Sequence, residues 1–267
     1  MSHRGPKISV VTVVLNGVTH LEATMRSVLD QAYPNLEYLV IDGGSTDGTL
    51  DVIRRYAQRL AWWVSEPDAG LYDAMNKGIR AATGDLIGII NAGDSYLPGA
   101  FAAVSAVPNA RSSVVTGDMI KFDEARAIEF LTRRGPADLA ITMRAMPLNH
   151  PATFVGADVY HRIGVFDTEF AICADNEFIL RAIRAGVNVV FLQTALARMG
   201  MGGLSESPRS IRRMAEEHYR IRQKHGCPKW VNAAMLAQYL IGRAARSAAW
   251  ATLPEAWQRA YYHRKRR

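Results

Sequence analysis

The chain has little cysteine, no long apolar run and no leader pattern. Its two cysteines, Cys173 and Cys227, show no paired spacing and no nearby histidine cluster, which argues against a disulfide framework or a zinc site. No stretch reaches the ~18 uninterrupted apolar residues of a membrane span. The opening MSHRGPKISVV is too short in its apolar part for a signal peptide and lacks a cleavage pattern. We therefore expect a protein of the reducing cytoplasm.

Two nucleotide-binding signatures are also absent. A dinucleotide enzyme would need G-x-G-x-x-G where the first strand meets the first helix, and this chain reads LNGVTHLE there. A nucleotidyltransferase would be expected to carry a glycine-rich, basic triphosphate loop after the first strand, and none is present. The nucleotidyltransferase remains a less favoured alternative, because it shares the early architecture and the use of a metal.

The chain does contain the pattern of an α/β core. Its 267 residues, 49% apolar and 21% charged, suit one globular core or a core with a tail. Three runs rich in Val and Ile, at 7–15, 37–41 and 85–90, have no helical period and alternate with segments of helical spacing. This order predicts a parallel sheet whose right-handed crossovers bring all the strands' carboxyl ends to one edge.

Three acid-bearing loops follow apolar runs of this predicted core. They read IDGGSTDGT at 41–49, EPDAGLYDAMNKG at 66–78 and INAGDS at 90–95. Because ligands of open parallel sheets bind outside the carboxyl edge, we expect the three loops to line one crevice.

Asp42 ends the second predicted strand, and the two glycines after it permit a tight turn. Ser45 or Thr46 is expected to cap a helix that begins near Asp47. Such capping explains the polar residues of the loop but not Asp42 itself. A carboxylate at this strand end is well placed to accept a base N–H or a ribose hydroxyl.

Asp94 follows a strand that we expect to be buried, and Gly93 before it lets the backbone approach a ligand. A carboxylate at the crevice can hold a hard divalent cation, which would neutralise a diphosphate leaving group. The structural alternative is that Asp94 caps a helix over 97–106 while Asn91 satisfies its own turn.

A later group of carboxylates lies in ICADNEFILRAIRAG at 172–186, where an apolar stripe predicts a helix. Asp175, at its start, is either the N-cap or a base aimed from the helix end into the crevice. Glu177 also fits a first-turn acid matched to the helix dipole.

The basic residues are concentrated after residue 207, although the whole chain carries a formal net charge of +7. We therefore expect no nucleic-acid partner. Residues 231–250 have an apolar side interrupted by Arg243 and Arg246. This segment either lies on an anionic membrane surface or packs on the catalytic domain with solvated arginines. Its neighbouring aromatic residues are Trp230, Trp250 and Trp257.

Together these stretches resemble the inverting family-2 glycosyltransferases, nucleotide-sugar enzymes of the GT-A fold, and particularly their bacterial polysaccharide-assembly, colanic-acid-type branch. The resemblance covers about residues 7–205. It implies an α/β fold with a Rossmann-like, mostly parallel sheet flanked by helices, followed by a helical C-terminal extension. The segments that carry it are VTVVLNG at 11–17, SVLDQAYPNLEYLVIDGGSTDGT at 27–49, EPDAGLYDAMNKGIRAATGDLIGIINAGD at 66–94, NHPATF at 149–154, GVFDTEFAICADNEFILRAIRAG at 164–186 and GGLS at 202–205.

The resemblance implies a donor site at the sheet edge, with Lys77 approaching the nucleotide or its phosphates. Uracil is the preferred base, with guanine and thymine as alternatives. The residues that would hold the base and its ribose are Thr12, Asn16, Asp42 and Asp68.

The resemblance also implies a metal position. Asp94 matches the last acid of the DxD-type motif, while Asn91 and Gly93, also on the donor side, stand where many relatives carry acids. With fewer carboxylates, Mn²⁺ or Mg²⁺ is expected to bind weakly until diphosphate oxygens complete its shell.

On the acceptor side, Asp175 falls where the family places its catalytic base. Ala174 replaces the usual acidic neighbour, so Asp175 acts alone or with help from Glu177. His150 matches a position lining the acceptor or diphosphate side, the alternative being a loop histidine hydrogen-bonded to backbone. The GGLS stretch is either a lid over the nucleotide or a turn before a helix that begins near Pro208.

The implied reaction is one in-line displacement that inverts the anomeric centre. Asp175 takes the proton of an acceptor hydroxyl, and the metal at Asp94 stabilises the departing diphosphate. The expected donor is a UDP-sugar carrying a hexosyl or N-acetylhexosaminyl group. The expected acceptor is a saccharide or lipid-linked hydroxyl of cell-surface polysaccharide or glycolipid assembly. A degenerate, non-catalytic nucleotide-sugar-binding protein is the main alternative, because the metal motif is thinned.

We expect a GT-A domain over 1–205, divided into a nucleotide-sugar half at 1–110 and an acceptor half at 111–205. A basic helical extension is expected over 206–267. Its hypothesised place is the inner face of the cytoplasmic membrane, where a lipid-linked acceptor would be presented.

Overall fold

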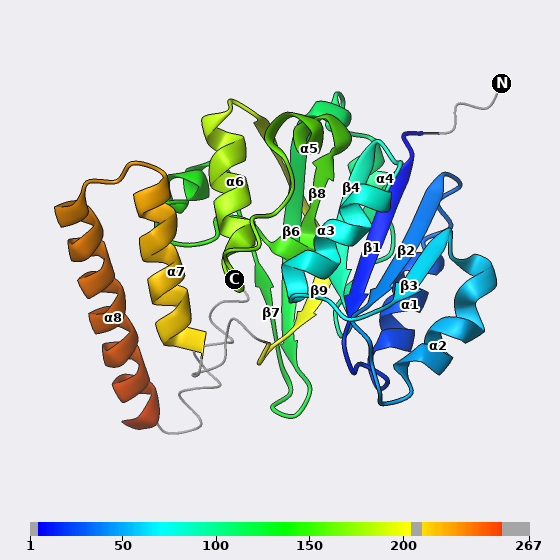
Figure 1. Ribbon diagram of the computed structural model, residues 1–267, viewed down its shortest axis with the longest axis horizontal. Coiled ribbons are helices and arrows are strands. Elements are labelled where there is room, and N and C mark those ends of the chain that lie inside the picture. Colours follow the sequence, from blue (N-terminus) through cyan, green and yellow to red (C-terminus); the bar gives the residue numbers. More distant parts are fainter. Residues whose placement is uncertain (1–4, 204–209, 253–267) are drawn as a thin grey trace.

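A mixed sheet forms the centre of the protein in the computed structural model, which describes residues 5–203 and 210–252, except for the side chains of 243–252 (Figure 1). Within these residues the sheet has nine strands, in the order β3-β2-β1-β4-β8-β6-β9-β5, with β7 paired to β6. The strands are β1 Ile8–Val14, β2 Leu36–Asp42, β3 Trp62–Ser65, β4 Leu86–Asn91, β5 Ser95–Tyr96, β6 Ser113–Asp123, β7 Ile128–Thr132, β8 Thr153–Gly156 and β9 Asn188–Gly200.

The parallel part of the sheet contains the three predicted strands, β1, β2 and β4. All of β1 and all but the first residue of β2 are buried, as expected of Val- and Ile-rich strands covered on both faces. β1 lies between its two neighbours, with Val14 opposite Asp42 and Val13 opposite Asn91. The carboxyl ends of these strands therefore meet at one edge. A fourth parallel strand, β3, lies beyond β2 and was not predicted.

The rest of the sheet contains the antiparallel pairs. β8 is antiparallel to both β4 and β6, whereas β9 is parallel to β6 and antiparallel to β5. The predicted α/β class, with helices flanking the sheet, is confirmed, and these pairs make the sheet mixed.

Helices cover both faces of the sheet. α3, α5 and α6 enclose one core, which includes Met75 and Phe178, and α1, α2 and α4 enclose the other, which includes Met25 and Phe101. The helices are α1 Leu21–Leu29, α2 Thr49–Tyr56, α3 Leu71–Ala81, α4 Ala100–Ser105, α5 Ala157–Ile163 and α6 Ala174–Arg184. Short 3₁₀ turns are η1 Ala57–Arg59, η2 Ala110–Ser112, η3 Pro136–Ile141 and η4 His150–Ala152.

Two further helices, α7 Ser210–Lys224 and α8 Lys229–Thr252, form a C-terminal hairpin in which α7 lies next to α6 (Figure 1). The predicted helical extension is confirmed. Among the described helices, none combines the length and apolar character needed to cross a bilayer. Outside the described part are Pro208, Trp257 and the side chains of Arg243, Arg246 and Trp250.

The predicted capping of α2 is wrong. The helix begins at Thr49 after Gly48, whose backbone lies in the left-handed region (φ 95°) that suits glycine. Neither Ser45 nor Thr46 is the cap. Instead, Asp47 Oδ1 accepts a hydrogen bond from the Thr49 N–H at 3.0 Å.

The structural alternatives for two candidate acids are also wrong. The N-cap of α4 is Gly99, so Asp94 does not cap that helix. The N-cap of α6 is Cys173, so Asp175 lies inside the first turn. Capping therefore explains neither carboxylate.

Candidate active site

Hydrogen bonds tie the loops after β1 and β2 together at the carboxyl edge. Asn16, whose backbone is left-handed (φ 50°), donates its N–H to Ser45 Oγ at 2.7 Å. Its Oδ1 accepts from the Thr46 N–H at 2.9 Å. Asn16 is exposed at the carboxyl edge of the sheet, and its contact with a nucleotide stays a prediction.

Asp42 is fully buried at the end of β2. Its carboxylate accepts from the Ser45 N–H at 3.1 Å, the Ser45 hydroxyl at 2.5 Å and the Ser65 hydroxyl at 2.6 Å. These contacts join the glycine turn to the end of β3. Asp42 thus fixes the turn after β2, and its contact with a base stays a prediction.

Asp68 lies in the loop between β3 and α3, next to the glycine turn after β2. Its carboxylate lies against Gly43, where an added Cβ would clash with Oδ2. Oδ1 accepts from the Gly70 N–H at 2.8 Å. A side chain at position 43 would therefore push the Asp68 carboxylate out of its present place.

Lys77, on α3, faces the loop between β3 and α3. Its Nζ lies 2.9 Å from Glu66 Oε1 and donates to the Pro67 carbonyl at 3.1 Å. The hydrogen bond to Glu66 raises the pKa of Lys77, so the side chain is a cation at neutral pH. Lys77 lies near Asp68, but its ammonium group forms its ion pair with Glu66.

The structure corrects the expectation for Thr12. This residue lies within β1, is completely buried, and shares a 2.9 Å hydrogen bond with the Tyr38 hydroxyl. A side chain fully buried in the core beside Tyr38 cannot contact a nucleotide at the edge of the sheet. Thr12 is a core residue because β1 continues for two further residues before its carboxyl edge.

Asp94 and Asn91 lie together after β4. Asp94 is 8% exposed and accepts from the Gly200 N–H at 3.3 Å. Burial raises its pKa to about 7, while this hydrogen bond and the charge of Lys121 act in the opposite direction. Asn91 Oδ1 is buried without a hydrogen-bond partner, which is costly for an amide oxygen.

These two side chains fit a hard cation in part. A carboxylate that is costly to ionise and an unpaired buried amide oxygen are both oxygen ligands of the type that Mn²⁺ and Mg²⁺ prefer. The part of the chain that the structure describes holds no group of three or more His, Cys, Asp or Glu side chains arranged for a metal. Within the described residues, the ligands are thus too few for a complete metal shell.

Asp175 lies half-buried in the first turn of α6. Burial raises the pKa of its carboxyl, while nearby His150 and a hydrogen bond with Tyr72 lower it. Asp175 Oδ1 also accepts from the Asn176 N–H at 2.8 Å. A carboxylate with a raised pKa is a stronger base than an ordinary aspartate, as proton abstraction from a hydroxyl requires.

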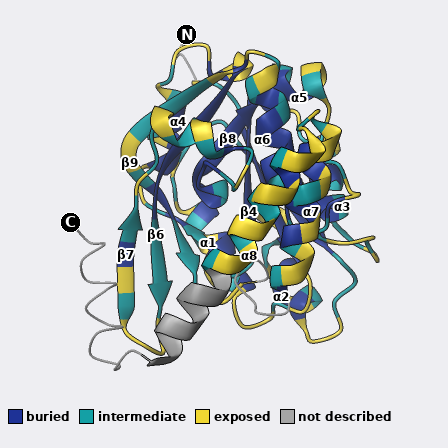
Figure 2. Cartoon of the chain, turned by 90° about the vertical axis from the view of Figure 1, so that its left-hand side faces the viewer, coloured by how far each residue is buried: buried dark blue, intermediate teal, exposed yellow. Residues whose placement is uncertain are grey.

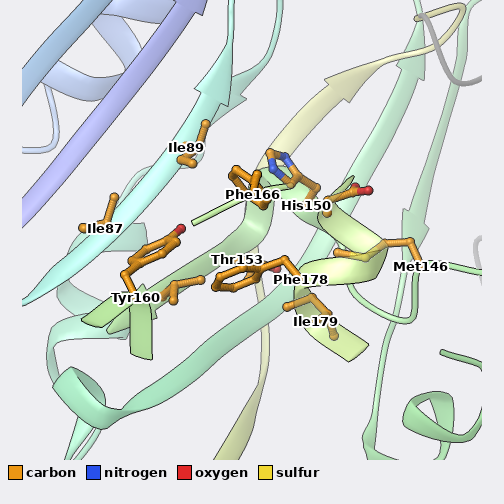
Figure 3. A pocket seen from close by; sticks show the side chains of 11 residues that line it. Ile87, Ile89, Met146, His150, Thr153, Tyr160, Phe166, Phe178 and Ile179 are labelled. Atoms are coloured by element: carbon orange, nitrogen blue, oxygen red, sulfur yellow. The ribbon is translucent and has the colours of Figure 1, made fainter. Parts of the chain in front are cut away.

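His150 and Asp175 line a small pocket between β4, α5 and α6, whose walls are otherwise largely apolar (Figure 3). Burial lowers the pKa of His150, so its imidazole is neutral at neutral pH. The ring lies 6.3 Å from that of Phe166. The pocket volume is about 20 Å³, which admits a water-sized group but no sugar.

The structure turns Glu177 away from this pocket. Its fully buried carboxylate pairs with Arg181 Nε at 2.7 Å, Lys224 Nζ at 3.0 Å and His225 Nε2 at 3.1 Å. Since α6 presents Asp175 and Glu177 to different neighbours, Glu177 joins α6 to α7. The expectation that it assists the base or lines the acceptor side is corrected.

Sequence reasoning missed three polar partners of the site. They are Ser65, which bonds Asp42; Tyr72, which interacts with Asp175; and Glu217, which bonds the segment before α6. Tyr72 lies within the motif that carries the resemblance, and no local signal marks the other two. Of the GGLS stretch, only Gly202 and Gly203 lie within the described residues.

Residues 9–160 match the sequence profile of Glycosyl transferase family 2. An uncharacterized glycosyltransferase of Mycobacterium tuberculosis strain H37Rv is 35% identical over 183 residues, 66% of this chain and 69% of its own. The chain belongs to glycosyl transferase family 2. A PGL/p-HBAD biosynthesis glycosyltransferase of Mycobacterium bovis is 31% identical over 211 residues, 76% of this chain and 80% of its own.

Solved structures share the family fold. The mannosyltransferase PcManGT from Pyrobaculum calidifontis, in complex with GDP-Man and Mn²⁺, superposes with a TM-score of 0.65 at 21% identity, covering 97% of this chain and 80% of its own. Residues 1–349 of S. aureus TarS, in complex with UDP-GlcNAc, give a TM-score of 0.63 at 17% identity, covering 88% and 71%.

Proposed function

We propose that this family 2 glycosyltransferase moves a hexosyl or N-acetylhexosaminyl group, with inversion, from a UDP-sugar to a hydroxyl of a saccharide or lipid-linked acceptor. The observation that carries the proposal is the position of Asp175. In the described part of the chain, it is the single carboxylate that lines the pocket, and its raised pKa suits a general base. Retention would call for a second nucleophile next to it.

In this proposal Asp175 accepts the proton of the acceptor hydroxyl as that oxygen bonds to the anomeric carbon and the nucleoside diphosphate leaves. Neutral His150 borders the reacting groups without adding charge. Asn16 and Asp68 hold the nucleotide at the sheet edge, and Asp42 fixes the turn beneath it.

Asp94 and Asn91 would hold Mn²⁺ or Mg²⁺ once the donor's oxygens complete the shell. A bound divalent cation supplies neutralisation of the charge that develops on the diphosphate. The unpaired Asn91 Oδ1 supports this assignment, as does the family neighbour in complex with Mn²⁺.

The relatives guide the choice of donor and acceptor. The TarS complex contains UDP-GlcNAc and the PcManGT complex contains GDP-Man, so nucleotide-diphosphate sugars are the donors to test. One relative is named for PGL/p-HBAD biosynthesis and another, from Bacillus subtilis, for teichuronic acid biosynthesis. These names favour assembly of a cell-surface glycolipid or polysaccharide, in the branch that the sequence resembles.

We also propose that α8 rests on the inner face of the cytoplasmic membrane. Trp230 and Ile241 are 77% and 69% exposed, and Ala233, Ala234 and Ala237 between them are exposed at helical spacing (Figure 2). The chain after residue 205 has 14 Lys and Arg against four Asp and Glu, a formal charge of +10, whereas residues 1–205 carry −3. An apolar stripe within a basic segment suits anionic headgroups.

The membrane proposal is tested by flotation with vesicles containing anionic lipid. Replacing both Trp230 and Ile241 with Ser should lower vesicle binding at least several-fold, since each substitution removes apolar surface that the membrane would bury. Transfer to a water-soluble acceptor should stay unchanged. Equal binding of the double variant and the unmodified protein would overturn this placement.

The donor site is tested by calorimetric titration of UDP, GDP and dTDP, with and without Mn²⁺. We expect Mn²⁺-dependent binding of one diphosphate, UDP by preference, that is lost in Asp94→Ala. Asp51→Ala, at an exposed aspartate of α2, is the matched control and should bind normally.

A transfer assay with the same protein separates an enzyme from the degenerate, non-catalytic alternative. Binding without any transfer would favour that alternative. Failure of every nucleotide to bind would remove the donor-site assignment.

A further inference from the structure

Three consecutive backbone N–H groups before α6 share one side-chain acceptor. The N–H of Ala171 donates to Glu217 Oε1 at 3.0 Å, and those of Ile172 and Cys173 donate to Oε2, each at 2.9 Å. Glu217 belongs to α7 and is 3% exposed. We call this set of bonds the Glu217 clamp.

The same segment is held from its other side by the donor half. The Tyr72 hydroxyl, on α3, donates to the Ile172 carbonyl at 2.8 Å. Tyr72 also interacts with the Asp175 carboxylate. Residues 171–173 therefore lie between one side chain from the donor half and one from the C-terminal hairpin.

Asp175 follows this segment directly, because Cys173 is the N-cap of α6. The direction in which α6 starts, and thus the position of its first-turn carboxylate, depends on where residues 171–173 are fixed. The pairing of Glu177 with Lys224 and His225 ties the same turn to α7 a second time.

A carboxylate suits this task better than a neutral side chain. Hydrogen bonds to an ionised acceptor are roughly twice as strong as neutral ones, and two carboxylate oxygens can serve three donors. Arg213 Nε, 3.1 Å from Glu217 Oε1, balances the buried charge. A glutamine keeps the shape but turns one of the two acceptor atoms into a donor.

We propose that Glu217 is a positioning residue for Asp175, so that the C-terminal hairpin completes the active site. This inference rests on the proposed function, in which Asp175 is the base. It assigns α7 a part in the reaction that its place outside the family profile, residues 9–160, does not suggest.

The test compares Glu217→Gln with two variants of the same helix. Glu216→Gln removes an exposed acid that pairs with Arg212, and it controls for the loss of one charge. Ile221→Ala removes a buried side chain of α7 that makes no bond to the clamp, and it controls for general loosening of the hairpin.

For Glu217→Gln we expect kcat to fall about 10- to 100-fold, the range for a small displacement of a catalytic group. KM for the donor and the Kd of UDP should stay within about twofold, since the donor loops are untouched. Amide exchange in peptides covering residues 171–173 should accelerate. Ile221→Ala should lower Tm while keeping kcat, and Glu216→Gln should change neither.

Two results would overturn the inference. One is a kcat for Glu217→Gln equal to that of Glu216→Gln. The other is a parallel loss of kcat, UDP binding and Tm no greater than that of Ile221→Ala, which indicates a structural role alone. If the unmodified protein transfers no sugar although amide exchange shows the clamp, the proposed function fails and the catalytic role of Glu217 fails with it. If transfer occurs and the amides of 171–173 exchange equally in all variants, the clamp alone fails.

Discussion

Two acids of the proposed site, Asp42 on its donor side and Asp175 on its acceptor side, are held in different ways. Asp42 is fixed by Ser45 and Ser65, three and 23 residues further along the chain. The segment before Asp175 is fixed by Tyr72, 100 residues away from its partner Ile172, and by Glu217, 44 to 46 residues away from its partners. Asp42 is thus held by residues close to it in the sequence, whereas the segment before Asp175 is held by two distant parts of the chain.

The sharpest way to break this contrast is to remove the base alone. Asp175→Asn should lower kcat about 10²- to 10⁴-fold, the range for loss of a general base, and leave UDP affinity unchanged. The matched control is Glu169→Gln. Glu169 is an exposed acid that precedes α6 and pairs with Arg220 of α7. Steady-state kinetics and titration give both quantities. A variant that keeps its kcat would show that another group takes the proton.

A glycine substitution tests the donor edge. Gly43→Ala should weaken UDP binding about 10-fold or more, because the new methyl group displaces the Asp68 carboxylate and a hydrogen bond to a charged group contributes about 1.5–3 kcal/mol. Tm should change little, since the group that moves is the end of a side chain. Gly135→Ala, where an added Cβ meets no atom within 4 Å, is the control. Unchanged UDP affinity in Gly43→Ala would show that Asp68 does not bind the nucleotide.

The hydrogen bonds to Asp42 should contribute to the free energy of unfolding. Ser65→Ala removes one donor to a buried carboxylate and should lower the free energy of unfolding by about 1–2 kcal/mol. Denaturant unfolding monitored by circular dichroism measures this change. A loss in nucleotide affinity without any loss of stability would mean that Ser65 acts on the ligand instead of on Asp42.

The smallest effect concerns pH. Burial raises the folded-state pKa of Asp175, so its contribution favours folding below the unfolded-state pKa and is lost as pH rises through the folded-state pKa. Asp175→Asn cannot ionise and lacks this loss. Its Tm relative to the unmodified protein should therefore rise between pH 4 and pH 8. A difference that does not vary with pH would argue against a raised pKa.

Much of the donor half was predictable because its signals are local. Val- and Ile-rich runs predicted β1, β2 and β4, and the expected meeting of the edge loops is seen where Gly43 lies against Asp68. Thr12 was assigned through the family resemblance alone, although it lies inside the strand that the apolar run predicted. The predicted cap of α2 was wrong because Gly48 adopts a left-handed backbone conformation, so that the helix starts at Thr49, after the predicted caps Ser45 and Thr46.

The acceptor half was less predictable because its contacts are long-range. The motif placed Asp175 near the start of a helix, but two of the three partners of Glu177 are far away in the sequence. Lys224, the last residue of α7, and His225, directly after it, follow Glu177 by nearly fifty residues. No periodicity or turn signal reports which distant side chain will meet a backbone N–H. The unpaired oxygen of Asn91 is likewise visible only once the surrounding atoms are in place.

The Glu217 clamp also sets an order of events during synthesis of the protein. A chain is made from its N-terminus, so the strands and loops of the donor edge leave the ribosome before α7 does. Until Glu217 has emerged, the amides of residues 171–173 have no carboxylate to bind. Under the proposed function, the segments that would bind the donor therefore emerge before the residue that positions Asp175.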